Sequence, residues 1–409
     1  MYENYKPKFT EWNEEDYKSS KLRYCEPMTA HALETEEDQI SHLSDPENYI
    51  EEKFDGTRAT CHFEKGGARV FSRRISKKTN WFTENTDSLP HIHEIDIPEL
   101  YGSVIDGEIF IPDRPFKDIS ATLNCIWDKA IERQNELGFA VLHTFDILYY
   151  NGVSVKHMKL KDRKVLLRKL MSVLEKHGIK CIEEVKYYPC GTELFDPKKY
   201  YESIVARGGE GVIIKNKNGI YEHKRSKAFL KIKKFYTREC ILLNFSEPTK
   251  YYDGKFPDDH WDYWETPDGA NLIMPSHSAK KLIKQGYKPL TRYYYNKWKG
   301  NMIFGVIIAN DDIPKLDKKK KEHVIEDFHI TDEYGDEHIY KVLVVGECSG
   351  FDDEVRKHLS DSDKGRVIEV KCNEIFKDTG KMRHPRFLRF RDDKSVYSCN
   401  YRNHIEEGV

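Results

Sequence analysis

The sequence predicts an α+β protein made of two domains with different architectures. The chain has 409 residues, which suffices for two or three domains of about 100 to 200 residues each. Short stretches rich in Val, Ile and Phe, separated by Gly and Asp turns, predict strands at 49–70 and 101–111, and helices interrupt them. After residue 235, short apolar runs alternate with long polar loops, which is typical of a small β-barrel with insertions.

Two helices are predicted in the first domain. Apolar residues recur at helical spacing from Asp162 to His177, and Gly178 supplies the stop signal. The second helix begins at Asp196, with Pro197 in the first turn, and runs to residue 206. Neither helix is expected to carry chemistry.

The remaining elements set the expected domain boundaries. Strands are predicted at 229–235, 239–245, 302–308, 340–346 and 367–375. Residues 248–300 are rich in Asp, Tyr, Trp and Pro and are long for a barrel loop, so we interpret them as an insertion without an assigned role. Residues 1–24 lack periodicity and are expected to be a short, loosely packed lead-in. The expected division is therefore 1–24, 25–236 and 237–409.

The composition excludes several classes of protein. Hydrophobic residues make up 38% of the chain and charged residues 33%, which indicates a folded rather than a disordered chain. No apolar run approaches the ~20 residues of a membrane span, and the polar, acidic start does not resemble a secretory signal. The nine cysteines are scattered without a Cys-x-x-Cys pair, so we expect neither disulfides nor a zinc site. A reducing cytoplasm is the expected location.

Any affinity for nucleic acid has to come from local basic patches, because the net charge is −2. The candidate patches are Arg73, Arg74, Lys77 and Lys78, and later Lys224, Arg225, Lys227, Lys231, Lys233, Lys234 and Arg238. The run from Lys318 to Lys321 has acidic neighbours and no aromatic residues between its lysines. We interpret that run as a solvated surface.

Six short motifs follow one another in the chain, and each of them alone could be an ordinary turn or surface strand. They are Lys53-Phe54-Asp55-Gly56-Thr57-Arg58, Asp106-Gly107-Glu108, Phe145-Asp146, Glu210-Gly211, Lys231-Ile232-Lys233 and Arg391-Asp392-Asp393-Lys394. In this order the series resembles the covalent nucleotidyltransferases, specifically the ATP-dependent DNA ligases. The resemblance extends from about residue 25 to about residue 400.

The resemblance implies a fold and a nucleophile. The fold would be an ATP-grasp-like nucleotidyltransferase domain with mixed antiparallel sheets and helices, followed by an OB-fold barrel. Lys53 would attack ATP and carry AMP as a phosphoramidate. A free lysine titrates near ~10.4, so its pKa would have to be lowered by neighbouring cations, here Lys231 and Lys233, and by a bound metal. The four-cysteine zinc module of NAD-dependent ligases is absent from this sequence.

The resemblance also implies roles for the other motif residues. Glu51 would read the adenine amine, Phe145 would stack on the adenine, and Arg58 would contact nucleotide and DNA groups. Glu108 would bind ribose or metal-bound water, and Glu210 would bind the metal. The remaining assignments are Lys231 and Lys233 to the phosphates, Arg73 or its neighbour Arg74 to the nick phosphate, and Arg391, Asp393 and Lys394 to the departing pyrophosphate.

The activity implied is a three-step sealing of nicks in duplex DNA, with ATP and Mg²⁺ or Mn²⁺. Lys53 would take AMP, pass it to a 5′-phosphate, and a 3′-hydroxyl would displace it. We expect a monomer without membrane attachment, in a bacterial or phage-infected cytoplasm, or in the nucleus if the host is eukaryotic. Only about 50 residues precede Lys53, so a compact two-domain ligase like those of viruses and bacteria is expected, with domain closure during self-adenylation.

Three alternatives remain. An mRNA capping guanylyltransferase shares the lysine motif, but such enzymes usually have Asp-Gly where this chain has Glu210-Gly211, and tryptophan where it has Ile232. An RNA ligase is disfavoured by the barrel-like second half and the motif that contains Arg391. A catalytically inactive nucleic-acid clamp is disfavoured because candidates occupy every catalytic position.

Overall fold

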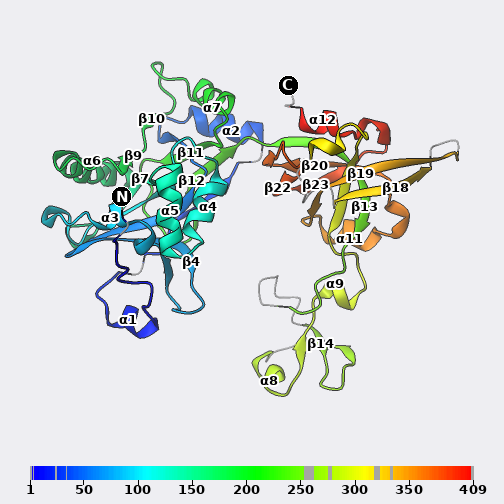
Figure 1. The fold of residues 1–409 in the computed structure, drawn as a ribbon, viewed down its shortest axis with the longest axis horizontal. Helices are drawn as coiled ribbons and strands as arrows, with labels where there is room; N and C mark the ends of the chain where they lie inside the picture. The colour runs from blue at the N-terminus through cyan, green and yellow to red at the C-terminus, as the bar shows by residue number, and fades with distance from the viewer. Residues whose placement is uncertain are drawn as a thin grey trace. The chain divides into compact units, whose positions relative to one another are not determined.

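The computed structural model describes residues 2, 4–23, 25–33, 35–252, 262–274, 279–316, 323–331 and 335–406. The chain divides into two compact units, Met1–Lys234 and Phe235–Val409. Figure 1 labels their helices and strands. Each unit is built around its own sheets and its own hydrophobic core.

The first unit contains two sheets. The five-stranded sheet has the order β1 (Thr29–Ala32), β12 (Arg225–Lys233), β11 (Gly211–Asn216), β2 (Asn48–Glu52) and β10 (Tyr187–Pro189). The seven-stranded sheet has the order β5 (Phe82–Glu84), β4 (Gly67–Ile75), β3 (Thr57–Glu64), β6 (Val104–Phe110), β7 (Val141–Tyr150) and β8 (Val153–Ser154), and β9 (Ile182–Glu184) pairs with β7. All pairs are antiparallel except β1 with β12 and β7 with β9.

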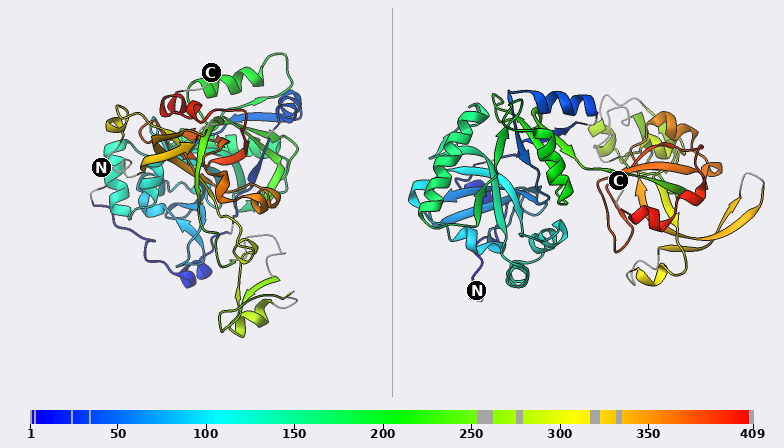
Figure 2. Two further views of the ribbon diagram at one scale, coloured as in Figure 1. Left: turned by 90° about the vertical axis from the view of Figure 1, so that its right-hand side faces the viewer. Right: turned by 90° about the horizontal axis from the view of Figure 1, so that it is seen from above.

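Seven helices surround these sheets in the described part of the first unit. They are α1 (Glu14–Ser19), α2 (Glu36–Ser44), α3 (Pro90–His93), α4 (Phe116–Leu123), α5 (Trp127–Leu137), α6 (Leu160–Lys176) and α7 (Pro197–Ala206), with short 3-10 turns η1 (Thr86–Ser88) and η2 (Pro98–Leu100). Helix α6 lies against the sheet that contains β7 and β9 (Figures 1 and 2). The two helices predicted from the sequence, α6 and α7, are confirmed. The predictions did not include α4 and α5.

Strand alternation places Glu51 of β2 on the face of the sheet opposite to the hydrophobic core residue Ile50. Ile50 is fully buried and packs in one cluster with Val212 and Ile214 of β11 and with Ile204 of α7. Because successive side chains of a strand point to opposite faces, Glu51 points to the other side of this sheet. Because Ile50 occupies the core face of β2, the candidate site residues of this strand lie on the opposite face.

The N-terminal lead-in is packed against the first unit, which corrects the expectation of loose packing for residues 1–24. The carboxylate of Asp87 accepts hydrogen bonds from the backbone amides of Lys8, Phe9 and Thr10, at 2.8, 2.8 and 2.7 Å. The Arg69 guanidinium lies 4.0 Å from the ring centroid of Phe9. Sequence periodicity gave no sign of this, because the segment is held by hydrogen bonds and cation–π contacts rather than by a regular element.

The second unit is built on one six-stranded antiparallel sheet. Its order is β18 (Val324–Thr331), β19 (Glu337–Cys348), β17 (Met302–Ile307), β13 (Tyr236–Phe245), β20 (Val367–Cys372) and β23 (Arg386–Phe390). The smaller elements are β21 (Glu374–Ile375), β22 (Met382–Arg383), α11 (Asp353–His358), α12 (Tyr401–Ile405), η4 (Ile313–Lys315), η5 (Asp361–Asp363) and η6 (Val396–Ser398). The α+β class and the predicted strands are confirmed. Over the described residues the sheet is open at β18 and β23 rather than closed into a barrel.

The chain between β13 and β17 forms a small sheet of its own (Figure 1). Its described elements are β14 (Tyr263–Glu265), β15 (Asn271–Ile273), β16 (Lys288–Pro289), α8 (Ala279–Lys284) and α9 (Arg292–Tyr295). Trp264 is fully buried there. Residues 253–261 and 275–278 of the predicted insertion, and the run Lys318–Lys321, lie outside the described residues.

Within the described residues, no helix combines the length and the apolar character that a membrane span requires.

Replacing Asp87 with asparagine should loosen the lead-in, because the amide group puts an NH₂ donor where the backbone amides need an acceptor. Hydrogen bonds lower the pKa of Asp87 against the opposing effect of burial, so the ionised form is the one that is bound. We expect a loss of about 1 to 3 kcal/mol in the free energy of unfolding by urea. The exposed Asp113→Asn variant serves as control and should change by less than about 0.5 kcal/mol. Equal stability of the two variants would contradict the anchoring role of Asp87.

Candidate active site

The proposed nucleophile lies where three neighbouring strands end. Lys53 follows β2, Glu210 precedes β11 and Lys233 ends β12, and these strands are adjacent in the order β12-β11-β2. The Lys53 backbone amide donates to the Gly211 carbonyl at 2.9 Å. Gly211 has φ +139°, and a Cβ there would lie 2.1 Å from the Ile232 carbonyl oxygen. The Glu-Gly motif therefore needs its glycine for the close approach of β11 to β12.

Glu210 connects the two lysines. One carboxylate oxygen of Glu210 binds the ammonium of Lys53 and the other binds the ammonium of Lys233. The Lys53 side chain is 20% exposed, so a ligand can still reach it. Lys231 lies on the same face of β12 as Lys233, and burial and then the charges of Lys233 and Lys53 lower its pKa. The structure thus brings these four predicted residues together.

Glu108 joins this cluster from the other sheet. It lies on β6 directly opposite Arg58 of β3. Burial raises the pKa of Glu108 to about 7, with a smaller contribution from Glu210, although Lys53 and Arg58 oppose the shift. Its charge is therefore incompletely compensated by the protein.

Arg58 is held by a residue to which the sequence analysis gave no role. The buried carboxylate of Asp106 accepts two hydrogen bonds from the Arg58 guanidinium, both at 2.6 Å. The Tyr221 hydroxyl also donates to Asp106, at 2.6 Å. The guanidinium lies 4.5 Å from the ring centroid of Phe145. Asp106 precedes Glu108 by two positions on a strand, so the alternation rule was a signal that both point to one face.

Glu51 is buried between two lysines that the sequence analysis did not select. It is 1% exposed, and its oxygens lie 2.6 Å from Lys164 Nζ and 2.5 Å from Lys215 Nζ. Lys215 Nζ also lies 4.1 Å from the centroid of the Phe145 ring. Burial lowers the pKa of Lys215 to about 8, against the effect of Glu51. Glu51 and Phe145, both predicted at the adenine, therefore meet at Lys215.

Helix α6, which was not expected to carry chemistry, supports Glu51 and Phe145. It supplies Lys164 and also Arg163, which donates two hydrogen bonds of 2.8 Å to the buried carboxylate of Asp146. Asp146 is the neighbour of Phe145, so the bidentate pair fixes the strand that presents the aromatic ring. The signal in the sequence was a pair of cations, Arg163 and Lys164, within an apolar helical pattern.

The other predicted residues lie outside this cluster. Arg73 and Arg74 are exposed at the end of β4, and neither forms an ion pair within the described part of the chain. Arg391, Asp393 and Lys394 belong to the second unit. There Arg391 pairs with Asp393 and with Glu239.

The donor set around Lys53 fits a divalent cation that is shared with a nucleotide. No group of three or more His, Cys, Asp or Glu side chains with metal-site geometry occurs among the described residues. Glu108 and Glu210 are two carboxylates beside one lysine, and the raised pKa of Glu108 shows a negative charge that a cation would compensate. Mg²⁺ usually binds through one or two carboxylates, substrate phosphates and water. These two residues are therefore the candidates to hold it.

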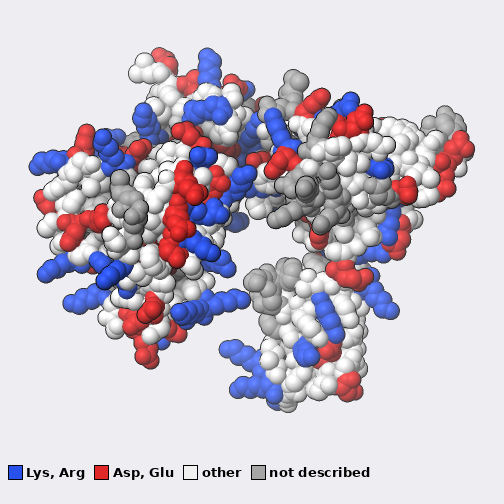
Figure 3. Space-filling model, viewed as in Figure 1, with Lys and Arg blue, Asp and Glu red and all other residues white. Residues whose placement is uncertain are grey.

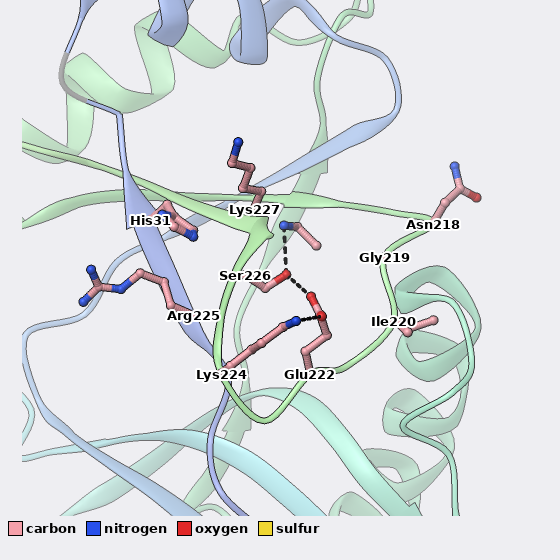
Figure 4. Close-up of a pocket in the computed structure, with 10 residues that line it drawn as sticks. His31, Asn218, Gly219, Ile220, Glu222, Lys224, Arg225, Ser226 and Lys227 are labelled. Carbon is pink, nitrogen blue, oxygen red and sulfur yellow. Dashed lines mark hydrogen bonds and ion pairs between the residues drawn. The ribbon is translucent and has the colours of Figure 1, made fainter. Parts of the chain in front are cut away.

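A basic pocket lies beside the start of β12. It has a volume of about 580 Å³, and its lining includes His31, Lys224, Arg225 and Lys227. Glu222 pairs with Lys224 at 3.0 Å and also accepts from the Ser226 hydroxyl (Figure 4). Arg225 and Lys227 have no acidic partner among the described residues, so they leave positive charge at the pocket.

Comparison with solved structures identifies the fold. A structure of Lig E DNA ligases is matched over 90% of this chain and 100% of its own, with a TM-score of 0.51 at 15% identity. A structure described as Pmar-Lig_Pre is matched over 90% of this chain and 68% of its own, with a TM-score of 0.52 at 20% identity. The fold is thus shared with DNA ligases.

Sequence comparison identifies the family. The family model of the ATP dependent DNA ligase domain matches residues 27–233, about half of the chain, so the chain belongs to this family. A DNA ligase of Methanococcus aeolicus is 28% identical over 215 residues, 51% of this chain and 36% of its own length. A DNA ligase of Sulfolobus acidocaldarius is 25% identical over 392 residues, 93% of this chain and 58% of its own length. The chain therefore spans between about a third and three fifths of these relatives.

The raised pKa of Glu108 predicts a pH-dependent stability in the absence of metal. A carboxyl with a pKa of about 7 in the folded state, against an ordinary value of 4.5, favours folding while it is protonated. This stabilisation is complete below pH 4.5 and is lost as the pH rises through 7. Between pH 5 and pH 8 we expect the wild type to lose up to about 2 kcal/mol more unfolding free energy than Glu108→Gln.

Urea unfolding at both pH values in a chelating buffer measures this difference. The Glu132→Gln variant, in which an exposed acid of α5 is replaced, should follow the wild type. Parallel pH profiles of the wild type and Glu108→Gln would show that Glu108 is not the titrating group.

Proposed function

We propose that this protein is an ATP-dependent DNA ligase that seals nicks in duplex DNA through AMP bound covalently to Lys53. The observation that carries the proposal is the position of the Lys53 amine, bound to Glu210 and close to Lys231, Lys233 and Glu108. Family membership and the shared fold support it.

In the first step the Lys53 amine has to leave Glu210 and lose a proton, for which the Glu210 carboxylate is in place as acceptor. The nitrogen lone pair then forms a bond to the α-phosphorus of ATP. The bond from this phosphorus to the bridging oxygen breaks, and pyrophosphate leaves with the bonding electrons. Lys231 and Lys233 compensate the negative charge that builds up on the phosphates.

Glu51, Phe145 and Arg58 would bind the nucleoside. Phe145 would stack on the adenine and Glu51 would accept from its amine. For this, the cations at the Phe145 ring and at Glu51, which are Arg58, Lys164 and Lys215, would have to move aside. Arg58 is oriented by Asp106 toward this place. Glu108 and Glu210 would hold Mg²⁺ or Mn²⁺, which supplies positive charge at the phosphates when bound.

The second unit would close over the nucleotide in the first step and then reorient to clamp the DNA. Arg391 and Lys394 would stabilise the departing pyrophosphate, which requires the second unit to bring them to the nucleotide bound by the first. Asp393 would orient Arg391, to which it is hydrogen-bonded at 2.8 and 2.9 Å.

In the later steps a 5′-phosphate oxygen at the nick attacks the phosphorus of lysyl-AMP, and the Lys53 amine leaves. The 3′-hydroxyl oxygen then attacks the 5′-phosphorus, and AMP leaves. Arg73 or Arg74, exposed on β4, would contact the nick phosphate. We propose a monomer that works in the cytoplasm, or in a nucleus if the host is eukaryotic.

Figure 3 shows Lys and Arg mixed with Asp and Glu on the visible faces rather than a uniformly basic surface. The attraction for DNA must therefore be local, and the pocket with Arg225 and Lys227 is a local source of positive charge. A guanylyltransferase remains disfavoured by Glu210-Gly211 and Ile232.

Self-adenylation tests the nucleophile. With magnesium and ATP labelled at the α-phosphate, the wild type should retain label after denaturation, and labelled GTP should give none. Lys53→Ala should lower labelling by at least about 1,000-fold, because no other side chain replaces the attacking amine. The exposed Lys77→Ala variant should be labelled like the wild type. Labelling of Lys53→Ala would exclude Lys53, and labelling by GTP alone would favour a capping enzyme.

The salt dependence of nick binding tests the basic pocket. Each cation removed from a DNA phosphate should reduce the slope of log K against log salt by about 0.9. Replacing both Arg225 and Lys227 with alanine should therefore flatten the slope by nearly 2. The double variant Lys129→Ala with Arg133→Ala removes the same charge from the exposed side of α5. Equal slopes for both double variants would show that the pocket does not contact DNA.

A further inference from the structure

Two carboxylates lie directly opposite each other in the sheet of the second unit. Glu239 of β13 pairs in register with Glu369 of β20. Like charges at directly opposite positions of antiparallel strands destabilise a sheet. Cations near these two carboxylates would therefore offset their repulsion.

Arg391 supplies the shared cation. Its Nη1 lies 3.1 Å from Glu239 Oε1 and 3.7 Å from Glu369 Oε2. Its Nε and Nη2 donate to Asp393 at 2.8 and 2.9 Å. Its side chain is only 15% exposed. All three guanidinium nitrogens thus face carboxylates.

The neighbouring cations complete the cluster. Arg389, directly opposite Glu369 in β23, donates to Glu369 Oε2 at 2.6 Å. Lys394 Nζ lies 3.6 Å from Glu239 Oε1. Glu239 therefore contacts Arg391 and Lys394, the two cations proposed to act on pyrophosphate. Glu369 shares Arg391 and is also satisfied by Arg389.

A guanidinium that clamps a phosphate presents at least two donors to its oxygens. Two of the five N–H donors of Arg391 bind Asp393, and its Nη1 is paired with Glu239 and Glu369, so a phosphate has to compete with these two glutamates for Nη1. We propose that Glu239 and Glu369 hold the Arg391 guanidinium before ATP is bound. These two carboxylates, here called the seat, compete with the phosphates of ATP for Arg391. The proposal rests on the function proposed above, because it assumes that Arg391 acts on pyrophosphate.

The seat should affect one step of the reaction. Pyrophosphate leaves only during self-adenylation, so the release of Arg391 from the seat matters only there. The joining of a nick that already carries AMP involves no pyrophosphate. A merely structural role of Glu239 would change both reactions together.

The experiment compares Glu239→Gln with the wild type in two single-turnover assays. Self-adenylation is followed over a range of ATP concentrations, and joining is followed on a pre-adenylated nick. The ATP concentration for half-maximal adenylation rate should fall roughly 2- to 5-fold in Glu239→Gln, as expected for loss of one partly exposed ion pair. The joining rate should be unchanged.

A matched control accounts for the charge removed. Glu374→Gln takes one negative charge from β21, where Glu374 pairs with Arg383 at 3.4 Å and not with Arg391. Its half-maximal ATP concentration should stay that of the wild type. In an Arg391→Ala background, Glu239→Gln should no longer lower the half-maximal ATP concentration, because the ion pair between Glu239 and Arg391 is already absent there.

Equal or higher ATP requirement in Glu239→Gln than in Glu374→Gln would overturn the proposal, as would parallel changes in adenylation and joining. Thermal unfolding of both Glu239→Gln and Glu369→Gln shows whether each variant folds. If Glu239→Gln does not fold, the same two assays are run on Glu369→Gln. If the wild type itself acquires no label from ATP, the proposed function fails. If the wild type is labelled and the variant behaves like the control, only the seat fails.

Discussion

The position of Glu210 between the ammonium groups of Lys53 and Lys233 is the interaction on which the proposed chemistry depends. It exists because the end of β2, the start of β11 and the end of β12 lie at one edge of the sheet, and because Gly211 lets β11 approach β12 closely. In the proposed mechanism the same carboxylate holds the amine, accepts its proton and shares a cation with Glu108. A change of register in any of the three strands would separate these groups.

Buried ion pairs keep the rest of the site in place. Asp106 orients Arg58, Asp146 binds Arg163, and Glu51 lies between Lys164 and Lys215. Burying such charges costs desolvation energy, so each has to be matched by partners of good geometry. In return the groups that would meet a nucleotide are already oriented before it binds.

The second unit applies the same principle at a surface where the partners can exchange. Arg391 is satisfied by Glu239, Glu369 and Asp393 within its own unit, and these ion pairs are more exposed than the Arg163–Asp146 pair of the first unit. Pairs that are partly open to solvent are weaker than fully buried ones, and under the proposal phosphate replaces them. The buried pairs are suited to holding one geometry, and the exposed pairs to changing it.

The sequence by itself determined the order of the motifs, the α+β class, helices α6 and α7, the strand before Lys53 and the strands that carry Glu108 and Lys233, because these follow from local periodicity and turn chemistry. Only the tertiary structure decided which charges meet. Lys53 and Glu210 are 157 positions apart, and Asp106, Lys164 and Lys215 acquired their roles from partners in other elements. The packing of the lead-in on Asp87 was decided in the same way, since hydrogen bonds between distant segments leave no periodic trace in a sequence.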